Sequence, residues 1–383
     1  VQYSYRNKYT LTASFRADAS SKFAPRNREG YFPSVAASWV VSHENWLRDA
    51  AWLDLLKLRA SYGVSGNQGI SPYQTFERFG YDYYWCNGEE YTVYRIGYQD
   101  GREGLGDRFV TYAGMANHEL TWEKTAQLRI GLDLSILKRR LNVTFDYYYK
   151  RTTDLLRKQY LSPSTGFDTV WVNDGEIRNK GFELTISSRN INHKNFQWTT
   201  DLVFSTNRLM VIDVGGERID LGNNAIAEAG KPWGSFFVLN RLGTWGLDEV
   251  DEARKYGKKP GDLKFEDRNH DYVIDDNDRR IMGNGTPKGD LTLVNTFRYK
   301  GFSLMVDLNA AYGFKIMGIT TTMMENRQLY GNSMKSVLNA WTPENQNSMI
   351  AALRLPSDVN FGENEKDSRM LYDGDFLRIR NIS

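Results

Sequence analysis

The sequence of 383 residues predicts an all-β protein, specifically part of a transmembrane antiparallel β-barrel of about ten strands with long extracellular loops. Apolar and polar residues alternate along many segments, which is typical of strands with one apolar and one wet face. The connections between these segments alternate between short and long, as they do in outer-membrane barrels. No apolar run approaches the roughly 18 to 20 residues that a membrane-spanning helix needs, which excludes a helical membrane protein.

The alternation is strictest between residues 127 and 136, and a short turn at 138–140 leads into a second alternating segment. Together the two segments predict a hairpin of two-faced strands. The same pattern predicts ten strands, at 3–18, 31–42, 56–65, 121–136, 141–152, 179–189, 196–207, 288–299, 302–313 and 375–383. The outward apolar face is expected to include Leu128, Ile130, Leu132, Leu134, Val143, Phe145, Leu184 and Leu202.

Four long connections separate the strands, and we expect all four to be extracellular loops. They run over 66–120, 153–178, 208–287 and 314–374. Loops of this length count against a compact soluble domain, whereas barrels combine short periplasmic turns with long extracellular loops. With every short turn on one side, the strands alternate in direction without conflict. The alternative is a soluble antiparallel sandwich, whose strands also alternate because one face packs on a core.

Composition and motifs exclude several classes of function. The 49 Lys and Arg against 47 Asp and Glu leave a net charge of +2, which gives no electrostatic basis for binding nucleic acid. Cys86 is the single cysteine, so neither an internal disulfide nor a thiolate metal site is available. The four histidines are scattered and no G-x-S-x-G motif is present, so the sequence does not support an enzyme. The sequence begins at Val1 without a start methionine and directly before an alternating segment, and we therefore expect the chain to be a fragment.

Several short sequence motifs, in a fixed order along the chain, are shared with a known family. They are Asp18-Ala-Ser-Ser-Lys-Phe23, Gly30-Tyr-Phe-Pro-Ser-Val35, Lys57-Leu-Arg-Ala-Ser-Tyr-Gly-Val-Ser-Gly-Asn-Gln68, Leu120-Thr-Trp-Glu-Lys-Thr125, Asn179-Lys-Gly-Phe-Glu183, Pro260-Gly-Asp-Leu-Lys264, the acidic loop from Asp267 to Arg279, Trp341-Thr-Pro-Glu-Asn345 and Asp375-Phe-Leu-Arg-Ile-Arg-Asn-Ile382. Nearly from end to end, the chain resembles SusC/RagA-type TonB-dependent outer-membrane transporters of the Bacteroidetes.

The resemblance implies a barrel of 22 strands with an N-terminal plug, energised through the TonB complex, in the cell outer membrane. It further implies import of glycan fragments or peptides together with a SusD-like surface lipoprotein. The ten strands would fit as strands 11 to 20, with the plug, the TonB-contacting part and the last strands outside this chain. Two other functions stay open on the residues alone: a soluble secreted glycan-binding or adhesion β-protein, and a passive porin.

An acidic segment at 267–278 has the spacing of a calcium loop. Oxygen ligands fall at loop positions 1, 3, 5, 9 and 12, and the carbonyl of position 7 completes the set, which suits Ca²⁺ in a structural role. The candidate ligands are Asp267, Asn269, Asp271, Val273, Asp275 and Asp278. Tyr272 occupies the position where such loops use Gly for the sharp turn. The alternative is a solvated acidic turn.

Aromatic residues are concentrated in the connection 66–120, where they are candidates for binding substrate. Aromatic rings can stack on the apolar faces of sugars while their polar edges stay wet. The candidates are Tyr81, Tyr83, Tyr84, Trp85, Tyr91 and Tyr94. The alternative is that these rings only pack the loop. Charged residues on the wet faces of the strands are expected mainly to pair across strands inside the barrel, although they could also contact the plug or substrate. They are Arg129, Asp133, Glu183, Asp201 and Asp307.

Overall fold

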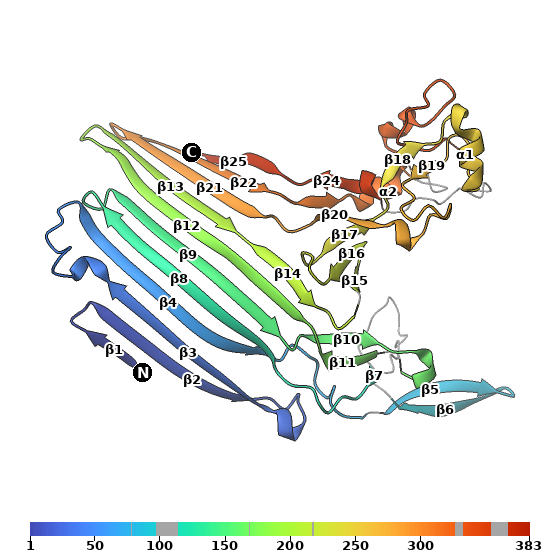
Figure 1. Ribbon diagram of the computed structural model, residues 1–383, viewed down its shortest axis with the longest axis horizontal. Helices are drawn as coiled ribbons and strands as arrows, with labels where there is room; N and C mark the ends of the chain where they lie inside the picture. Colours follow the sequence, from blue (N-terminus) through green and yellow to red (C-terminus); the bar gives the residue numbers. More distant parts are fainter. Residues whose placement is uncertain (78, 97–113, 168, 217, 326–331, 354–366) are drawn as a thin grey trace. The chain divides into compact units, whose positions relative to one another are not determined.

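The computed structural model describes residues 1–383 except 78, 97–113, 168, 217, 326–331 and 354–366. The chain divides into two units, which we describe separately (Figure 1). Unit 1 comprises Val1–Gly216 and Val294–Met305, and unit 2 comprises Glu217–Leu293 and Val306–Ser383. In the described residues, no helix is long and apolar enough to cross a membrane.

One large sheet of twelve strands accounts for most of the regular structure, as the sequence predicts. Its strand order is β1-β2-β3-β4-β8-β9-β12-β13-β21-β22-β25, and β14 pairs with β12 beside this path. From β1 to β13 each neighbouring pair is antiparallel. The strands are β1 Gln2–Tyr5, β2 Tyr9–Ala19, β3 Glu29–Val40, β4 Leu53–Asn67, β8 Glu123–Ile136, β9 Leu141–Thr153, β12 Glu176–Asn192, β13 Phe196–Thr206, β14 Arg208–Asp213, β21 Gly289–Tyr299, β22 Phe302–Tyr312 and β25 Phe376–Ile382.

The prediction of one strand at 3–18 is wrong, because this stretch holds two strands and a turn. Arg6 and Asn7 have φ angles of 52° and 53°, and they reverse the chain between β1 and β2. Tyr5 and Tyr9 pair across the turn and are four residues apart, so the period-two pattern passes through the turn without a break. The main path therefore holds eleven strands where the sequence predicts ten.

The strand predicted to end at 207 continues as β14. Both β13 and β14 pair with the long strand β12, and the interruption lies near Thr206. Gly181 of β12 lies opposite this break, where an added Cβ would come within 1.9 Å of the carbonyl oxygen of Thr206. Thr206 Oγ1 accepts a hydrogen bond of 3.1 Å from the backbone N–H of Phe182. A side chain at position 181 would block this close approach of the two strands.

Short elements fill the four long connections. In unit 1 these are β5 Phe79–Cys86, β6 Glu89–Ile96, β7 Gly114–Met115, β10 Leu156–Tyr160 and β11 Thr169–Asn173. In unit 2 they are β15 Arg218–Gly222, β16 Ala225–Glu228, β17 Ser235–Val238, β18 Arg241–Thr244, α1 Val250–Lys255, β19 Leu263–Phe265, β20 Arg280–Asn284, β23 Lys315–Met317, α2 Ile319–Glu325 and β24 Leu371–Asp373. Apart from β14, these strands form small sheets of their own.

An apolar cluster in unit 1 joins the ends of the strands to the long connection 66–120. Phe23, Phe32, Ile70, Leu120 and Trp122 are its buried members. The rings of Phe23 and Phe32 lie 5.6 and 5.4 Å from the ring of Trp122. Trp122 Nε1 also donates a hydrogen bond of 2.9 Å to the carbonyl of Arg28. The cluster therefore anchors the connection that follows β4 to the link between β2 and β3.

Candidate functional site: the polar face of the large sheet and its connections

Two neighbouring rows of paired residues show that the sheet of unit 1 has an apolar and a polar face. Successive residues of a strand point to opposite faces, so adjacent rows lie on opposite sides. The apolar row is Tyr9, Trp39, Leu58, Leu132, Phe145, Leu184 and Phe204. The polar row is Thr10, Ser38, Arg59, Gly131, Asp146, Glu183 and Ser205.

The apolar face is not packed into a core. The exposed fraction is 69% for Phe15, 50% for Ile130 and 42% for Leu58. All eight residues predicted on the outward face share it by register, and none of them is buried. A soluble sandwich would bury this face against a second layer. The exposed apolar face fits contact with lipid instead, which is the arrangement of an outer-membrane barrel strand.

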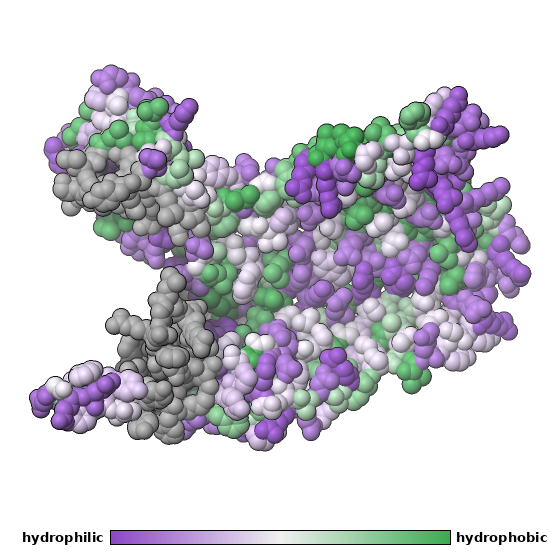
Figure 2. Space-filling model, turned by 180° about the vertical axis from the view of Figure 1, so that it is seen from behind, coloured by the Kyte–Doolittle hydropathy of each residue, from purple (hydrophilic) through white to green (hydrophobic). Residues whose placement is uncertain are grey.

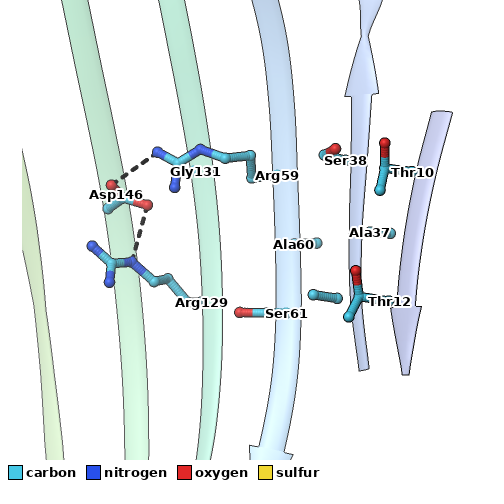
Figure 3. A pocket seen from close by; sticks show the side chains of 11 residues that line it. Thr10, Thr12, Ala37, Ser38, Arg59, Ala60, Ser61, Arg129, Gly131 and Asp146 are labelled. Atoms are coloured by element: carbon cyan, nitrogen blue, oxygen red, sulfur yellow. Dashed lines mark hydrogen bonds and ion pairs between the residues drawn. The ribbon is translucent and has the colours of Figure 1, made fainter. Parts of the chain in front are cut away.

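The polar face carries a ladder of ion pairs across four strands. Arg59 Nη2 of β4 donates hydrogen bonds of 3.0 Å to both Asp133 Oδ1 and Asp146 Oδ2. Arg129 Nε of β8 donates to Asp146 Oδ1 at 3.1 Å, and its Nη2 donates to Glu183 Oε2 at 3.0 Å. Asp146 is buried between the two guanidinium groups (Figure 3). This confirms the expected pairing of Arg129, Asp133 and Glu183 across strands. Asp307 lies 4.0 Å from Arg380 Nε of the neighbouring strand, whereas Asp201 forms no ion pair with a residue that the structure describes.

Gly131 makes the centre of this ladder possible. It pairs with Arg59 on one side and with Asp146 on the other, so the arginine must cross β8 at this point. A Cβ on Gly131 would lie 2.5 Å from Asp146 Oδ1 and 2.9 Å from Cζ of Arg59. The missing side chain thus leaves the path through which Arg59 reaches Asp146.

Arg59 and Asp146 were not among the residues predicted from the sequence. Each lies on the polar face of an expected strand. The two residues are 87 positions apart in the sequence, and β8 lies between their strands. A register alignment of the three predicted strands would have found them, because it places a charged residue on each side of Gly131. Composition and periodicity alone do not supply this register.

A hollow of about 210 Å³, lined by alanine as well as by polar side chains, lies beside the ladder. Hydroxyl groups line one side and the two guanidinium groups line the other (Figure 3). The lining includes Thr10, Thr12, Ser38, Ser61, Arg59 and Arg129. Figure 2 shows hydrophilic residues predominating over the middle strands on this face of the sheet. The hollow can therefore offer hydrogen bonds to a polar molecule or to another segment of the protein.

The candidate calcium loop adopts the sharp turn that its spacing suggests. Tyr272 has a φ of 65°, the left-handed conformation that usually calls for Gly. Its ring packs edge-on at 5.4 Å from the ring of Tyr256, which in turn lies 5.4 Å from Trp245. These ring contacts hold Tyr272 in place and explain how a bulky residue is tolerated at the turn position.

The acidic side chains of this loop hydrogen-bond its own backbone. Asp267 accepts from the N–H groups of His270 and Tyr272 at 2.7 and 3.0 Å. Asp278 is fully buried and accepts from the N–H groups of Arg268 and Asp275 at 2.8 and 2.9 Å. Among the described residues, no group of three or more His, Cys, Asp or Glu side chains is placed to hold a metal ion. A cation would have to displace some of these hydrogen bonds.

The same contacts set the protonation states of Asp267 and of its neighbour Tyr256. Burial disfavours the charged form of Asp267, but the backbone hydrogen bonds and that from the Tyr256 hydroxyl hold the pKa of Asp267 below its ordinary value. Burial, with the nearby Asp267 charge, raises the pKa of Tyr256 to about 12. The loop therefore carries an ionised Asp267 and a neutral Tyr256 at physiological pH.

The aromatic candidates lie on the hairpin of β5 and β6. Tyr83, Tyr84, Trp85 and Tyr91 are exposed by 57%, 59%, 65% and 50%. Tyr84 pairs with Tyr91 on one face, and Tyr83 and Trp85 lie on the other. The register pairs Tyr81 with Tyr94, whose side chains lie outside the described part. The described rings thus occupy two faces of the hairpin and do not form one platform.

A family model for the β-barrel of TonB-dependent receptor-like proteins matches residues 1–332. The chain belongs to this family. Its strands are thus part of an outer-membrane receptor barrel, and the two faces described above are its lipid-facing and interior sides.

Curated relatives of this barrel family match the whole chain. TonB-dependent receptor P3 of Formosa agariphila is 32% identical over 399 residues, and the match covers 100% of this chain and 37% of the receptor. TonB-dependent receptor SusC of Bacteroides thetaiotaomicron is 30% identical over 400 residues, with 100% of this chain and 36% of SusC covered. The chain therefore spans less than two fifths of the length of these relatives.

Solved structures of the RagAB peptide transporter have the same fold. In one of them a chain superposes with a TM-score of 0.78 at 23% identity, covering 100% of this chain and 40% of that chain. A second, in the closed-closed state of the RagAB peptide importer, gives a TM-score of 0.79 at 22% identity. The likeness supports the barrel-strand assignment for the full chain.

Proposed function

We propose that the protein containing this chain imports oligomeric nutrients, either glycans or peptides, through the outer membrane. The observation that carries the proposal is the two-faced sheet, with an exposed apolar side and an interior side of ion pairs and hydroxyl groups. Such a sheet separates lipid from a polar passage. In this proposal the TonB complex supplies energy through the plug, and a SusD-like lipoprotein covers the extracellular side. The likeness to the RagAB peptide transporter and the match to the TonB-dependent receptor SusC support import that depends on TonB.

The chemistry of the hollow and the hairpin supports glycans or peptides as the substrate class. Hydroxyl and guanidinium groups suit the hydroxyls of a sugar or the carbonyls of a peptide backbone. The exposed rings of Tyr83 and Trp85 share one hairpin face and could stack on the apolar side of a sugar. The proposal therefore assigns glycan contact to this face and general hydrogen bonding to the hollow.

A second proposal concerns Ca²⁺, which we infer as a weak structural ligand of the loop 267–278. The spacing of its oxygen atoms and the left-handed conformation of Tyr272 favour it. Because Asp267 and Asp278 already bind backbone N–H groups, we expect an affinity in the weak extracellular range of about 10⁻⁴ to 10⁻³ M.

The transport proposal is tested with the complete receptor in its own outer membrane. Labelled oligosaccharides and oligopeptides are offered to cells, and uptake is followed with and without a functional TonB. Active import predicts accumulation of one class that stops when TonB is removed. Uptake that persists without TonB would identify a passive porin instead.

The role of the polar face is tested with Arg59→Gln combined with Arg129→Gln. The matched control is Arg254→Gln combined with Lys255→Gln, which removes two positive charges on the exposed surface of α1. The first variant should lower uptake at equal surface level, while the control should leave it unchanged. Equal uptake by both variants would contradict a role for the ladder in the passage.

A further inference from the structure

The short turns of unit 1 carry an unusual concentration of positive charge. Four turns connect β1 to β2, β8 to β9, β12 to β13 and β21 to β22. The segments 6–8, 137–140, 189–195 and 298–301 contain nine Lys or Arg residues and no Asp or Glu. Removing these nine from the 49 basic residues of the chain leaves 40 against 47 acidic ones, so the remainder is net negative. The four turns are therefore net positive, whereas the rest of the chain, including the connection 41–52 at the same end with Glu44 and Asp49, is net negative.

The four turns lie at the same end of the sheet, and backbone hydrogen bonds link neighbouring connections there. Leu137 N–H donates to the carbonyl of Trp52, and Arg189 N–H donates to that of Arg140, at 2.9 and 2.8 Å. Lys300 N–H donates to the carbonyl of Asn195 at 3.3 Å. Figure 2 shows hydrophilic residues gathered at these strand ends. We call the nine Lys and Arg residues of the four turns the basic belt.

Most of the basic belt has no acidic partner. Lys8 pairs with Glu44, while Arg140 donates to the carbonyls of Arg189 and Asn190 at 3.2 and 2.7 Å. In the part of the chain that the structure describes, no carboxylate forms an ion pair with the other cations. These are Arg6, Lys138, Arg139, Arg189, Lys194, Arg298 and Lys300, and all seven are exposed.

Exposed apolar and aromatic side chains accompany the basic belt. Trp46, Trp52 and Phe302 are exposed by 70%, 57% and 80%. Leu137 and Tyr299, within the turns themselves, are exposed by 54% and 51%. Aromatic residues beside cations mark the level of lipid head groups, where rings meet the edge of the hydrocarbon and cations meet phosphates. A soluble acidic partner would account for the cations but not for the exposed indole rings.

We propose that the basic belt binds the head groups of anionic phospholipids in the periplasmic leaflet. Short turns of outer-membrane barrels are periplasmic, which places the belt beside that leaflet. The exposed rings anchor the same strand ends in the interface, directly below the apolar outer face. The binding is electrostatic and selects phosphatidylglycerol over zwitterionic phosphatidylethanolamine. This lipid binding would fix the position of the barrel in the membrane, and it does not depend on the proposed transport.

The test uses the complete receptor in vesicles of phosphatidylethanolamine with increasing phosphatidylglycerol. Tryptophan quenching by brominated phosphatidylglycerol, competed with brominated phosphatidylethanolamine, gives the relative binding of the two lipids. We expect a preference for phosphatidylglycerol that weakens at high salt, because salt screens exposed charges. If the wild type shows no preference for phosphatidylglycerol, the proposal is overturned. An acidic protein would then be the expected partner of the basic belt.

Two variants with equal loss of charge decide where the preference originates. The belt variant combines Lys138→Gln, Arg139→Gln, Lys194→Gln and Lys300→Gln, and the control combines Lys231→Gln, Arg254→Gln, Lys255→Gln and Lys335→Gln. A basic residue at a charged membrane surface changes binding by roughly fivefold. The belt variant should therefore lose at least about tenfold of the preference, and the control should keep it. Equal loss in both variants would show a general charge effect and overturn the assignment.

Discussion

Arg241 and Asp367, 126 residues apart in the chain, form an ion pair that is buried on both sides. The side chains are 4% and 0% exposed, and Arg241 Nε donates to Asp367 Oδ2 at 2.8 Å. Arg241 Nη1 also donates to the carbonyl of Met349 at 2.7 Å. Next to the pair, Arg369 forms two hydrogen bonds of 3.0 and 2.9 Å with Glu325. Within unit 2, these contacts fasten the connection 314–374 to the connection 208–287.

Removing one partner of this pair should loosen both connections. Asp367→Ala leaves a buried guanidinium without its carboxylate, which costs roughly 3 to 5 kcal/mol. Hydrogen exchange of the complete receptor in detergent should then rise in segments 235–245 and 367–373, while the large sheet stays protected. Asp251→Ala, which breaks an exposed pair with Arg254, should change exchange little. Equal exchange in both variants would contradict a stabilising role for the buried pair.

The lipid-facing assignment predicts a strong difference between two neighbouring positions. Leu132 on the apolar face and Thr144 on the polar face lie on adjacent strands, and Thr144 pairs with Asp133. Leu132→Arg should obstruct insertion, because an arginine facing lipid near the midplane costs about 2 to 4 kcal/mol. Thr144→Arg should insert normally, since it adds a cation beside an acidic residue. Surface level of the complete receptor is the measurement, and equal levels would contradict the assignment of faces.

The alternation of residues made this part of the fold predictable. In segments such as 127–136 the polarity of each side chain indicates which face of the sheet it occupies, because successive residues of a strand point to opposite faces. The turn between Tyr5 and Tyr9 was not predicted, because its length keeps the apolar residues of both strands in the same alternation. Contacts such as Arg241 to Asp367 follow no local pattern, because they join connections whose path depends on the whole fold. The polar-face ladder is intermediate: Arg129, Asp133 and Glu183 were predicted from the alternation, but Arg59 and Asp146 required the strand register.

Gly131 offers a test of the ladder that keeps every charge. Gly131→Val places a side chain where Arg59 crosses β8 and also against Asp146 Oδ1, which accepts from Arg129, so the hydrogen bonds of both arginines to Asp146 should weaken. Losing a hydrogen bond to a charged group costs about 1.5 to 3 kcal/mol. The unfolding midpoint of the detergent-solubilised receptor should fall accordingly. Gly216→Ala is the matched control, since no atom lies within 4 Å of its added Cβ. Equal midpoints for both variants would show that Arg59 has another path.

Glu44 gives the strand ends a pH-dependent contribution. The hydroxyl of Tyr9, the amine of Lys8 and Nε1 of Trp39 donate to its carboxylate at 2.6, 3.0 and 3.1 Å. These hydrogen bonds lower the pKa of Glu44 from 4.5 to about 2. Because the folded pKa is the lower one, the contribution is complete above pH 4.5 and is lost as the pH falls through about 2.

The variant Glu44→Gln separates this effect from general acid unfolding. At pH 6 the wild type should resist urea better than the variant, and the difference should shrink steadily between pH 4.5 and pH 2. Urea midpoints of the complete receptor in detergent measure it. A difference that stays constant over this range would mean that the carboxylate charge does not contribute.

The last prediction concerns Ca²⁺ at the loop 267–278. If the ion binds, it exchanges the backbone hydrogen bonds of Asp267 and Asp271 for metal contacts and holds the loop more firmly. Millimolar Ca²⁺ should then protect the complete receptor from protease cleavage between residues 244 and 287, and a chelator should remove that protection. Asp267→Ala combined with Asp271→Ala should be cleaved equally with and without Ca²⁺. Asp251→Ala combined with Glu252→Ala removes the same charge from α1 and should retain the Ca²⁺ effect. If Ca²⁺ gives the wild type no protection, the segment is an acidic turn stabilised by its own backbone and by the ring contact of Tyr272 with Tyr256.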